Sequence, residues 1–233
     1  MTVSDSGYID IENFSSDWSD ITLLQQRRQN TIYTAKRYGK RYLLKGISPE
    51  YQSLTDIRLL QEKEFSFGIS LSHSNIAETY SLEDVQELGR CIVMEYVDGL
   101  TLAEWIKTSP SRAQRERVLA QLLEVLEYIH SLQLVHHDLK SSNVLITRNG
   151  QNVKLIDFGL SDTDSTSDSN DASIDLQLFG NILALLFPKR YRSIVRACQQ
   201  GSYPNIAALK QAFHRQHIWR KSMPYLILSL LFA

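Results

Sequence analysis

Several features that mark other protein classes are scarce in this 233-residue sequence. Only two cysteines occur, Cys91 and Cys198, far apart and each among apolar neighbours, which argues against a disulfide framework or a cysteine metal site. A net charge of −1 supplies no overall basic field, so nucleic acid is not an expected partner. The polar, acidic N-terminus shows no secretory signal, and with the free cysteines this predicts a cytoplasmic protein.

A long apolar run is also missing, and the nearest approach to one is residues 223–233. As a helix this run would be about 16 Å long at 1.5 Å per residue, whereas a bilayer core is about 30 Å thick. Because Trp219, Arg220 and Lys221 precede it, weak contact of residues 219–233 with the inner face of a membrane is one expectation. Packing against the rest of the chain is the other, and a longer anchor is expected only if the sequence is a fragment.

Charge and turn signals divide the first half of the chain. Residues 1–20 carry five carboxylates and no Lys or Arg, so they form an acidic N-terminal segment. Two β-rich runs flank Tyr38-Gly39-Lys40 and predict a hairpin that ends at Lys45. Residues 54–72 then predict a helix, two further strands are expected within 76–97, and a break at Asp98-Gly99 separates a lobe at 21–97 from a second lobe at 98–222.

The second half is mostly helical. A short helix is expected at 100–108 and a long one at 112–132, with the inward stripe Val118, Leu122, Val125, Leu126 and Ile129. Strands at 143–147 and 152–156 flank Asn149-Gly150, a strong hairpin signal because both residues tolerate positive φ. Residues 161–173 are polar and rich in hydroxyl groups, which predicts a mobile segment before helices resume near Asp175. The fold class is therefore α+β.

Six short motifs occur in an order that resembles the eukaryotic-type protein kinase superfamily. They are YLLK (42–45), LSHSNI (71–76), CIVMEYVDGLTL (91–102), HHDLKSSN (136–143), DFG (157–159) and DLQLFGNIL (175–183). Each is weak alone, but their order and spacing extend the similarity from about residue 30 to residue 215. The resemblance implies two lobes: an antiparallel sheet with one helix, then a mainly helical lobe.

The resemblance also implies roles in phosphoryl transfer, which requires positioning and neutralisation of phosphate charge. Asp138 would orient the acceptor hydroxyl and take its proton, and Lys140, typical of the serine/threonine group, would steady the γ-phosphate. Asn143 and Asp157 offer the oxygen ligands that Mg²⁺ prefers, with Mn²⁺ as an alternative.

Other residues would bind ATP. Lys45 would contact the α- and β-phosphates and be held by a helix carboxylate, for which Glu62 and Glu64 compete. Helical geometry favours Glu64, because it shares a face with Ile57, Leu60 and Phe67, whereas Glu62 is about 200° away. The adenine would be bordered by Met94 and Leu145 and would pair with backbone groups of Glu95 and Val97.

The sequence departs from the family pattern at four places, as a compact, divergent member would. The glycine-rich loop is absent, since its glycines would fall at Gln25, Arg27 and Asn30. Leu43 replaces a small alanine over the adenine, and His137 replaces the arginine that reads an activating phosphate. No A-P-E follows Asp157, so the usual peptide-docking platform is missing.

Three functions fit these residues. The favoured one is a serine/threonine kinase acting on an unidentified protein substrate, because Lys45, Glu64, Asp138, Asn143 and Asp157 are all present. A pseudokinase or nucleotide-binding interaction module follows from the lost glycines and platform. A small atypical kinase with a non-peptide or specialised acceptor is the third.

Overall fold

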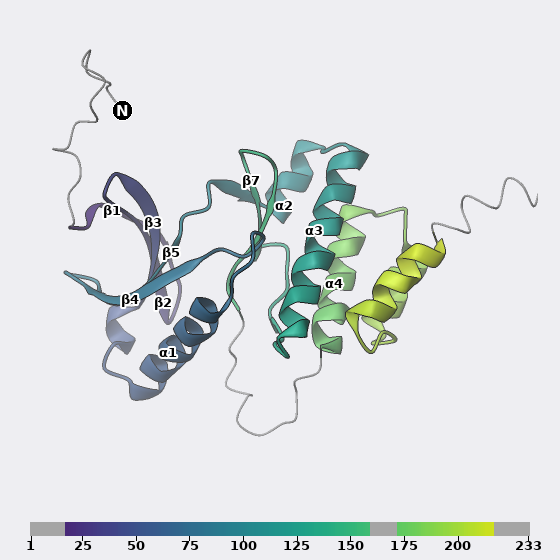
Figure 1. Ribbon diagram of the computed structural model, residues 1–233. Helices are drawn as coiled ribbons and strands as arrows, with labels where there is room; N and C mark the ends of the chain where they lie inside the picture. Colours follow the sequence, from purple (N-terminus) through teal and green to yellow (C-terminus); the bar gives the residue numbers. More distant parts are fainter. Residues whose placement is uncertain (1–16, 159–171, 217–233) are drawn as a thin grey trace, which may run out of the picture. The chain divides into compact units, whose positions relative to one another are not determined.

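The computed structural model describes residues 17–158 and 172–216 (Figure 1). The chain divides into two compact units between Val97 and Asp98, next to the Asp98-Gly99 break. Three sequence predictions fall outside the described residues: most of the acidic segment 1–20, the polar segment up to residue 171, and the membrane or packing contact of 219–233.

The first unit contains a five-stranded antiparallel sheet with strand order β1-β2-β3-β5-β4. Its strands are β1 (Ser19–Gln26), β2 (Asn30–Arg37), β3 (Lys40–Ile47), β4 (Thr79–Val85) and β5 (Gly89–Glu95). The predicted β2–β3 hairpin is confirmed, and its tight turn has positive φ at Tyr38 and Gly39, the pattern that matches strand twist. Strand β1 was not predicted, because all eight of its residues are exposed and no alternation of apolar residues marks it.

One face of this sheet carries an apolar cluster. Ala35, Leu44, Val85, Cys91 and Val93 are buried there, and half-buried aromatic residues that include Trp18 and Tyr42 pack against them. Because successive side chains of a strand point to opposite faces, Leu44 and Lys45 face away from each other. Lys45 therefore lies on the face of β3 opposite this cluster.

Helix α1 (Thr55–Ser70) packs on the sheet through polar and small residues. Its one buried side chain is Gln61, whose amide donates to the carbonyls of Arg90 at 3.0 Å and Lys45 at 3.4 Å. A Cβ atom at Gly68 would overlap Oγ1 of Thr79, so the helix approaches β4 closely there. The helix was predicted, but the apolar residues expected to mark its face are only half-buried.

The second unit begins with strand β6 (Gly99–Thr101), which joins β7 (Val144–Thr147) and β8 (Val153–Leu155) in the order β6-β7-β8. Helix α2 (Leu102–Trp105) continues into the 3-10 turn η3 (Ile106–Thr108), and helix α3 spans Arg112–Ser131. Capping boxes start both α-helices, Thr101 with Glu104 and Ser111 with Gln114. The predicted stripe of α3 is confirmed, since all five of its side chains are fully buried.

The β7–β8 hairpin is present, with a wider turn than the sequence predicts. Thr147 N donates to Asn152 O at 2.9 Å and closes a four-residue connection. Positive φ occurs at Gly150 and Gln151, not at Asn149, so the Asn-Gly pair does not form a two-residue turn. Each strand is correspondingly shorter than predicted.

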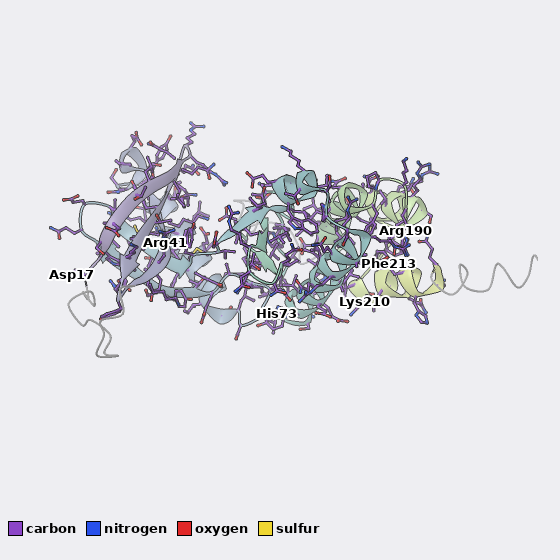
Figure 2. The ribbon with its side chains drawn as sticks, turned by 90° about the horizontal axis from the view of Figure 1, so that it is seen from above. Asp17, Arg41, His73, Arg190, Lys210 and Phe213 are labelled. Carbon is purple, nitrogen blue, oxygen red and sulfur yellow. The ribbon has the colours of Figure 1, made fainter. Side chains whose placement is uncertain are left out.

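Three helical segments complete the second unit: α4 (Ser173–Leu186), α5 (Arg192–Gln199) and residues 206–216. Figure 1 shows α4 beside α3. Phe213 packs edge-on against Tyr191, which packs in the same way against Phe187. Arg190 lies over the Tyr191 ring at 4.5 Å, and Figure 2 labels Arg190 and Phe213 at this end of the unit. These contacts fix the segment 206–216 to the unit.

The two cysteines are buried in different units, and burial raises the pKa of each thiol to about 12. Both are therefore protonated and unreactive at neutral pH. Within residues 17–158 and 172–216, no helix is both long enough and apolar enough to cross a membrane.

The close contact of α4 with α5 gives a stability prediction. A Cβ at Gly180 would lie 2.8 Å from the Cβ of Cys198, so Gly180→Ala should force the helices apart. Overpacking costs about 1–3 kcal/mol, which should exceed the gain of about 1 kcal/mol from better helix propensity. Urea denaturation should show a less stable variant, while Glu124→Ala on the exposed face of α3 should change little. An unchanged or higher midpoint for Gly180→Ala would contradict this packing.

Candidate functional site

The loop at residues 136–143, between α3 and β7, is held by one buried carboxylate. Asp175, in the first turn of α4, is fully buried and accepts hydrogen bonds from the backbone N–H groups of His136 at 2.8 Å and His137 at 3.0 Å. It also contacts Nε2 of His130 at 2.9 Å. His137 has a φ of +61°, an uncommon value for a residue other than glycine. Asp175 therefore fixes a strained backbone at the start of this loop.

The imidazole of His136 connects three parts of the site. Its Nε2 lies 3.2 Å from the carbonyl of Ile156, and its Nδ1 lies 3.3 Å from the N–H of Asp138. These partners fit the neutral ring with the proton on Nε2. Burial lowers the pKa of His136, which keeps the ring neutral. The ring also packs against Phe158 with 4.7 Å between centroids.

Asp138 presents a carboxylate that is both accessible and oriented. Its Oδ2 accepts from Lys140 Nζ at 2.5 Å and from Asn143 Nδ2 at 2.9 Å, and the same amide donates to the Asp138 carbonyl at 3.0 Å. The Asp138 side chain is 42% exposed, so a substrate hydroxyl could reach it. A positioned carboxylate beside an ammonium group can accept a proton and place a phosphate next to a positive charge.

The β7–β8 hairpin brings Asn143 and Asp157 together. Val144 is paired with Leu155, and the next backbone hydrogen bond runs from Ile156 N to Asn143 O at 2.9 Å. Asp157 directly follows Ile156, the residue whose backbone is hydrogen-bonded to the buried Asn143. The Asp157 backbone therefore lies next to Asn143. Its φ of +53° is again uncommon.

This donor set suits a magnesium ion. Among the described residues, no three His, Cys, Asp or Glu side chains form a metal-holding cluster. Asn143 directs its amide nitrogen at Asp138, which leaves its side-chain oxygen on the other side of the amide. An amide oxygen and a carboxylate fit Mg²⁺, which proteins often hold by one or two side chains together with substrate phosphates.

In the first unit, Lys45 forms an ion pair with Glu64 of α1. Both side chains are mostly buried, at 11% and 20% exposure. Glu62 instead pairs with Arg90 at 2.6 Å, where both side chains are over 40% exposed. The structure thus places Glu64, the candidate favoured by helix geometry, against the lysine.

The residues expected around the adenine lie on β5 and β7. Leu43 and Met94 are direct partners across β3 and β5, so the larger leucine stands next to Met94. The N–H of Glu95 donates to the Glu78 carbonyl at 2.8 Å, so pairing of Glu95 with the base stays a prediction for its backbone carbonyl. Val97 is half-buried at the end of the first unit. Leu145 points away from the buried Val144 and Ile146 and is half-buried on the other face of β7.

The turn at residues 27–29, at the position of the family's glycine-rich loop, is held by hydrogen bonds within the first unit. Ser48, fully buried, donates from its hydroxyl to the Arg27 carbonyl at 3.1 Å and from its N–H to the Gln29 carbonyl at 2.9 Å. Arg28 Nε donates to the Tyr51 hydroxyl at 3.2 Å. The turn is therefore anchored, whereas a glycine loop would be adaptable.

Sequence reasoning gave no role to three residues that shape the site: Asp175, His136 and Gln61. Asp175 is an acidic residue at the start of a strongly apolar helix, and this pattern could have indicated that its carboxylate is buried. A buried carboxylate requires hydrogen-bond partners, so a structural role could have been expected. His136 belonged to a recognised motif, but its ring partner Ile156 lies 20 residues further along the chain. Nothing in the α1 pattern marked Gln61 as buried.

An oriented carboxylate, an adjacent lysine and two oxygen donors at a hairpin end are the kinds of group that phosphoryl transfer requires. The chain belongs to the protein kinase domain family, whose family model matches residues 28–176, well over half of the sequence. This match confirms the expected superfamily and its α+β kinase-like fold.

Curated relatives are serine/threonine-protein kinases. The chain is 36% identical over 100 residues to PrkC of Bacillus subtilis, which aligns 42% of this chain and 15% of the relative. It is 36% identical over 110 residues to a probable kinase PknB of Lactococcus lactis (45% and 17%) and 31% identical over 156 residues to TIO of Arabidopsis thaliana (65% and 11%). The chain thus matches less than one fifth of the length of these relatives. The likeness supports the serine/threonine protein kinase-like class.

The buried His136 gives a prediction about pH. Because its pKa is lowered from 6.5 in the folded state, the unfolded chain binds more protons below that value. Stability should therefore be full above pH 6.5 and fall as the pH drops, by at most about 1.4 kcal/mol per pH unit from this group. Between pH 7.5 and 5.5, His136→Asn should lose less unfolding free energy than the wild type, although it starts less stable. Equal losses in both proteins would contradict the assignment.

Proposed function

We propose that this chain catalyses Mg-ATP-dependent transfer of a phosphoryl group to a serine or threonine hydroxyl of a protein substrate. The observation that carries the proposal is the arrangement of Asp138, whose Oδ2 is held by Lys140 and Asn143. Because Asn143 is also hydrogen-bonded to Ile156, the same loop places Asp157 nearby.

In this proposal Asp138 accepts the proton of the attacking hydroxyl. Its accessible oxygen atoms and the two donors to Oδ2 fix the direction of the carboxylate. Lys140 lies at the same oxygen and places a positive charge where the transferred phosphoryl group would carry its charge. Orientation and charge neutralisation are the main requirements of this chemistry.

Nucleotide binding rests on the remaining residues. Lys45, oriented by Glu64, would contact the α- and β-phosphates. Asn143 and Asp157 would hold Mg²⁺, which supplies charge neutralisation of the phosphates when it is bound. Mn²⁺ has the same preference for oxygen ligands in such a site.

Two observations in the first unit favour a second function. The turn at residues 27–29 is anchored by Ser48, and Leu43 stands against Met94. Both features would restrict a nucleotide, so a nucleotide-binding interaction module without turnover is the competing proposal. Transfer of the γ-phosphoryl group from ATP to any acceptor, protein or other, separates the two.

Binding of Mg-ATP should raise the melting temperature of the wild type, since a ligand that binds only the native state stabilises it by RT ln(1 + [L]/Kd). Glu64→Gln should reduce this shift strongly, because Lys45 loses its charged partner. Glu62→Gln is the matched control and should keep the shift, since its pair with Arg90 is exposed. Thermal denaturation at millimolar Mg-ATP gives the measurement, and no shift in the wild type would exclude nucleotide binding.

Asp138→Asn should reduce phosphoryl transfer by about 100-fold or more, the range expected for loss of a general base. The variant should keep the Mg-ATP-induced stabilisation, since Asn143 and Asp157 remain. Asp98→Asn is the control, because Asp98 forms an exposed pair with Arg148. Radiolabel transfer from ATP to protein acceptors measures the rate, and near-normal turnover in Asp138→Asn would refute the assigned role.

A further inference from the structure

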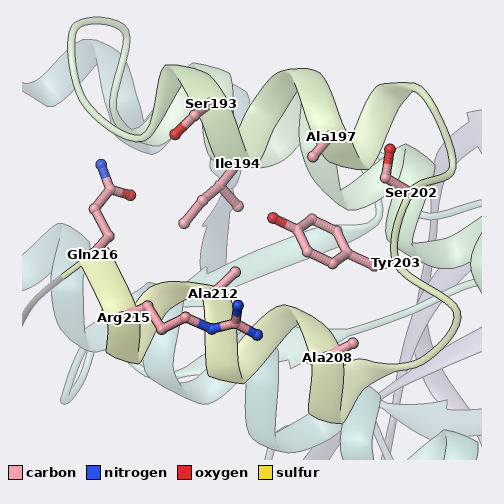
Figure 3. A pocket seen from close by; sticks show the side chains of 9 residues that line it. All are labelled: Ser193, Ile194, Ala197, Ser202, Tyr203, Ala208, Ala212, Arg215 and Gln216. Carbon is pink, nitrogen blue, oxygen red and sulfur yellow. The ribbon is translucent and has the colours of Figure 1, made fainter.

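A groove runs between α5 and the helical residues 206–216 (Figure 3). Its volume is about 590 Å³, within the range of about 300–1,000 Å³ typical of ligand sites. Small side chains line both of its walls. The lining residues with apolar side chains are Ile194 and Ala197 of α5 and Ala208 and Ala212 of the facing helix.

The groove exists because alanine fills little space where the two helices face each other. Elsewhere larger side chains close the gap, as Phe213 does against Tyr191. Ala197, Ala208 and Ala212 are half-buried, so each leaves apolar surface in contact with solvent. Figure 3 shows the ring of Tyr203 pointing into the groove near its middle. An apolar occupant would complete the packing of both helices.

One polar atom at an end of the groove, the side-chain oxygen of Gln216, has no hydrogen-bond partner among the described residues. Oε1 of Gln216 is buried and accepts no hydrogen bond within the described part of the chain. An unpaired buried acceptor costs free energy, so a backbone N–H of an occupant would be favourable there. Gln216, which lines the groove, is also the last residue of this helix that the structure describes.

We propose that this groove is occupied by residues 223–233 of the same chain. This inference does not depend on the proposed kinase activity. The segment MPYLILSLLFA has no charged side chain and offers leucine, isoleucine and phenylalanine side chains to the alanine walls. Basic Arg220 and Lys221 fall in the connecting residues, where no contact with the groove is required.

The connection is long enough for this return. Six residues, 217–222, separate Gln216 from Met223 and can span about 20 Å when extended. The helical residues 206–216 are about 15 Å long at 1.5 Å per residue. The segment can therefore turn back and reach any part of the groove. A tether this short gives an effective concentration in the millimolar range, so even a weak contact would be populated.

Hydrogen exchange of the full chain and of a chain ending at Ser222 tests the proposal. Peptides covering residues 193–203 and 206–216 should exchange at least several-fold faster in the shortened chain, because the groove loses its cover. A synthetic peptide of residues 223–233 should restore slow exchange in the shortened chain and have little effect on the full chain. Equal exchange in the full and shortened chains would overturn the proposal.

A matched pair of substitutions locates the contact. Ala208→Trp would fill the groove, whereas Ala207→Trp changes an exposed position on the same helix. In the shortened chain, the peptide should protect the Ala207→Trp variant as it does the parent and fail to protect Ala208→Trp. Circular dichroism checks that both are folded, and if Ala208→Trp does not fold, the parent peptide experiment decides.

A membrane is the competing occupant for the same apolar segment. Vesicles of phosphatidylcholine with phosphatidylserine should leave the slow exchange of the groove in the full chain unchanged. Faster exchange in the groove peptides on binding to vesicles would show that the segment prefers lipid and would overturn the proposal.

Discussion

The shape of the loop at residues 136–143 depends on the buried carboxylate of Asp175. A charge without access to water is costly unless donors surround it, and here two backbone N–H groups and one imidazole do so. The carboxylate lies in the first turn of α4, where the helix dipole also favours a negative charge. Because both backbone donors belong to consecutive residues, His136 and His137, the chain path at this point has little freedom.

The other site residues take their positions from this fixed point. The ring of His136 is hydrogen-bonded to the carbonyl of Ile156 and to the N–H of Asp138. Ile156 is in turn hydrogen-bonded to Asn143. The base candidate and both candidate metal ligands are thus joined by backbone and buried side-chain contacts within the second unit. Two residues of this site, His137 and Asp157, have positive φ, and strained backbone of this kind persists only where the surroundings determine it.

Sequence patterns predicted the parts of this arrangement that follow from periodicity. Helix α3 has its five stripe residues fully buried, and the β7–β8 hairpin places Asn143 opposite Ile156 as two strands joined by a short turn require. The pairing of Lys45 with Glu64 follows from the same reasoning, since only one face of a helix can meet the strand.

Other features were not predictable in this way. Strand β1 is exposed along its length, so its sequence lacks the alternation of apolar and polar residues that marks a half-buried strand. Helix α1 buries Gln61, because its amide satisfies two backbone carbonyls of the sheet, and a polar residue in a contact face breaks the apolar pattern. The turn at 27–29 is held by Ser48, and a contact so distant in sequence has no local signal.

This turn also separates the two functions that the residues support. A glycine loop approaches phosphates with its backbone, because no Cβ intervenes and the chain adapts. Here the carbonyls of Arg27 and Gln29 already accept hydrogen bonds from Ser48, and Arg28 is engaged with Tyr51. In this unit the proposed phosphate contact is Lys45, whose direction is set by Glu64. The loop at residues 136–143 is held by contacts that do not involve this turn, so transfer of the γ-phosphoryl group is the property that decides between a kinase and a binding module.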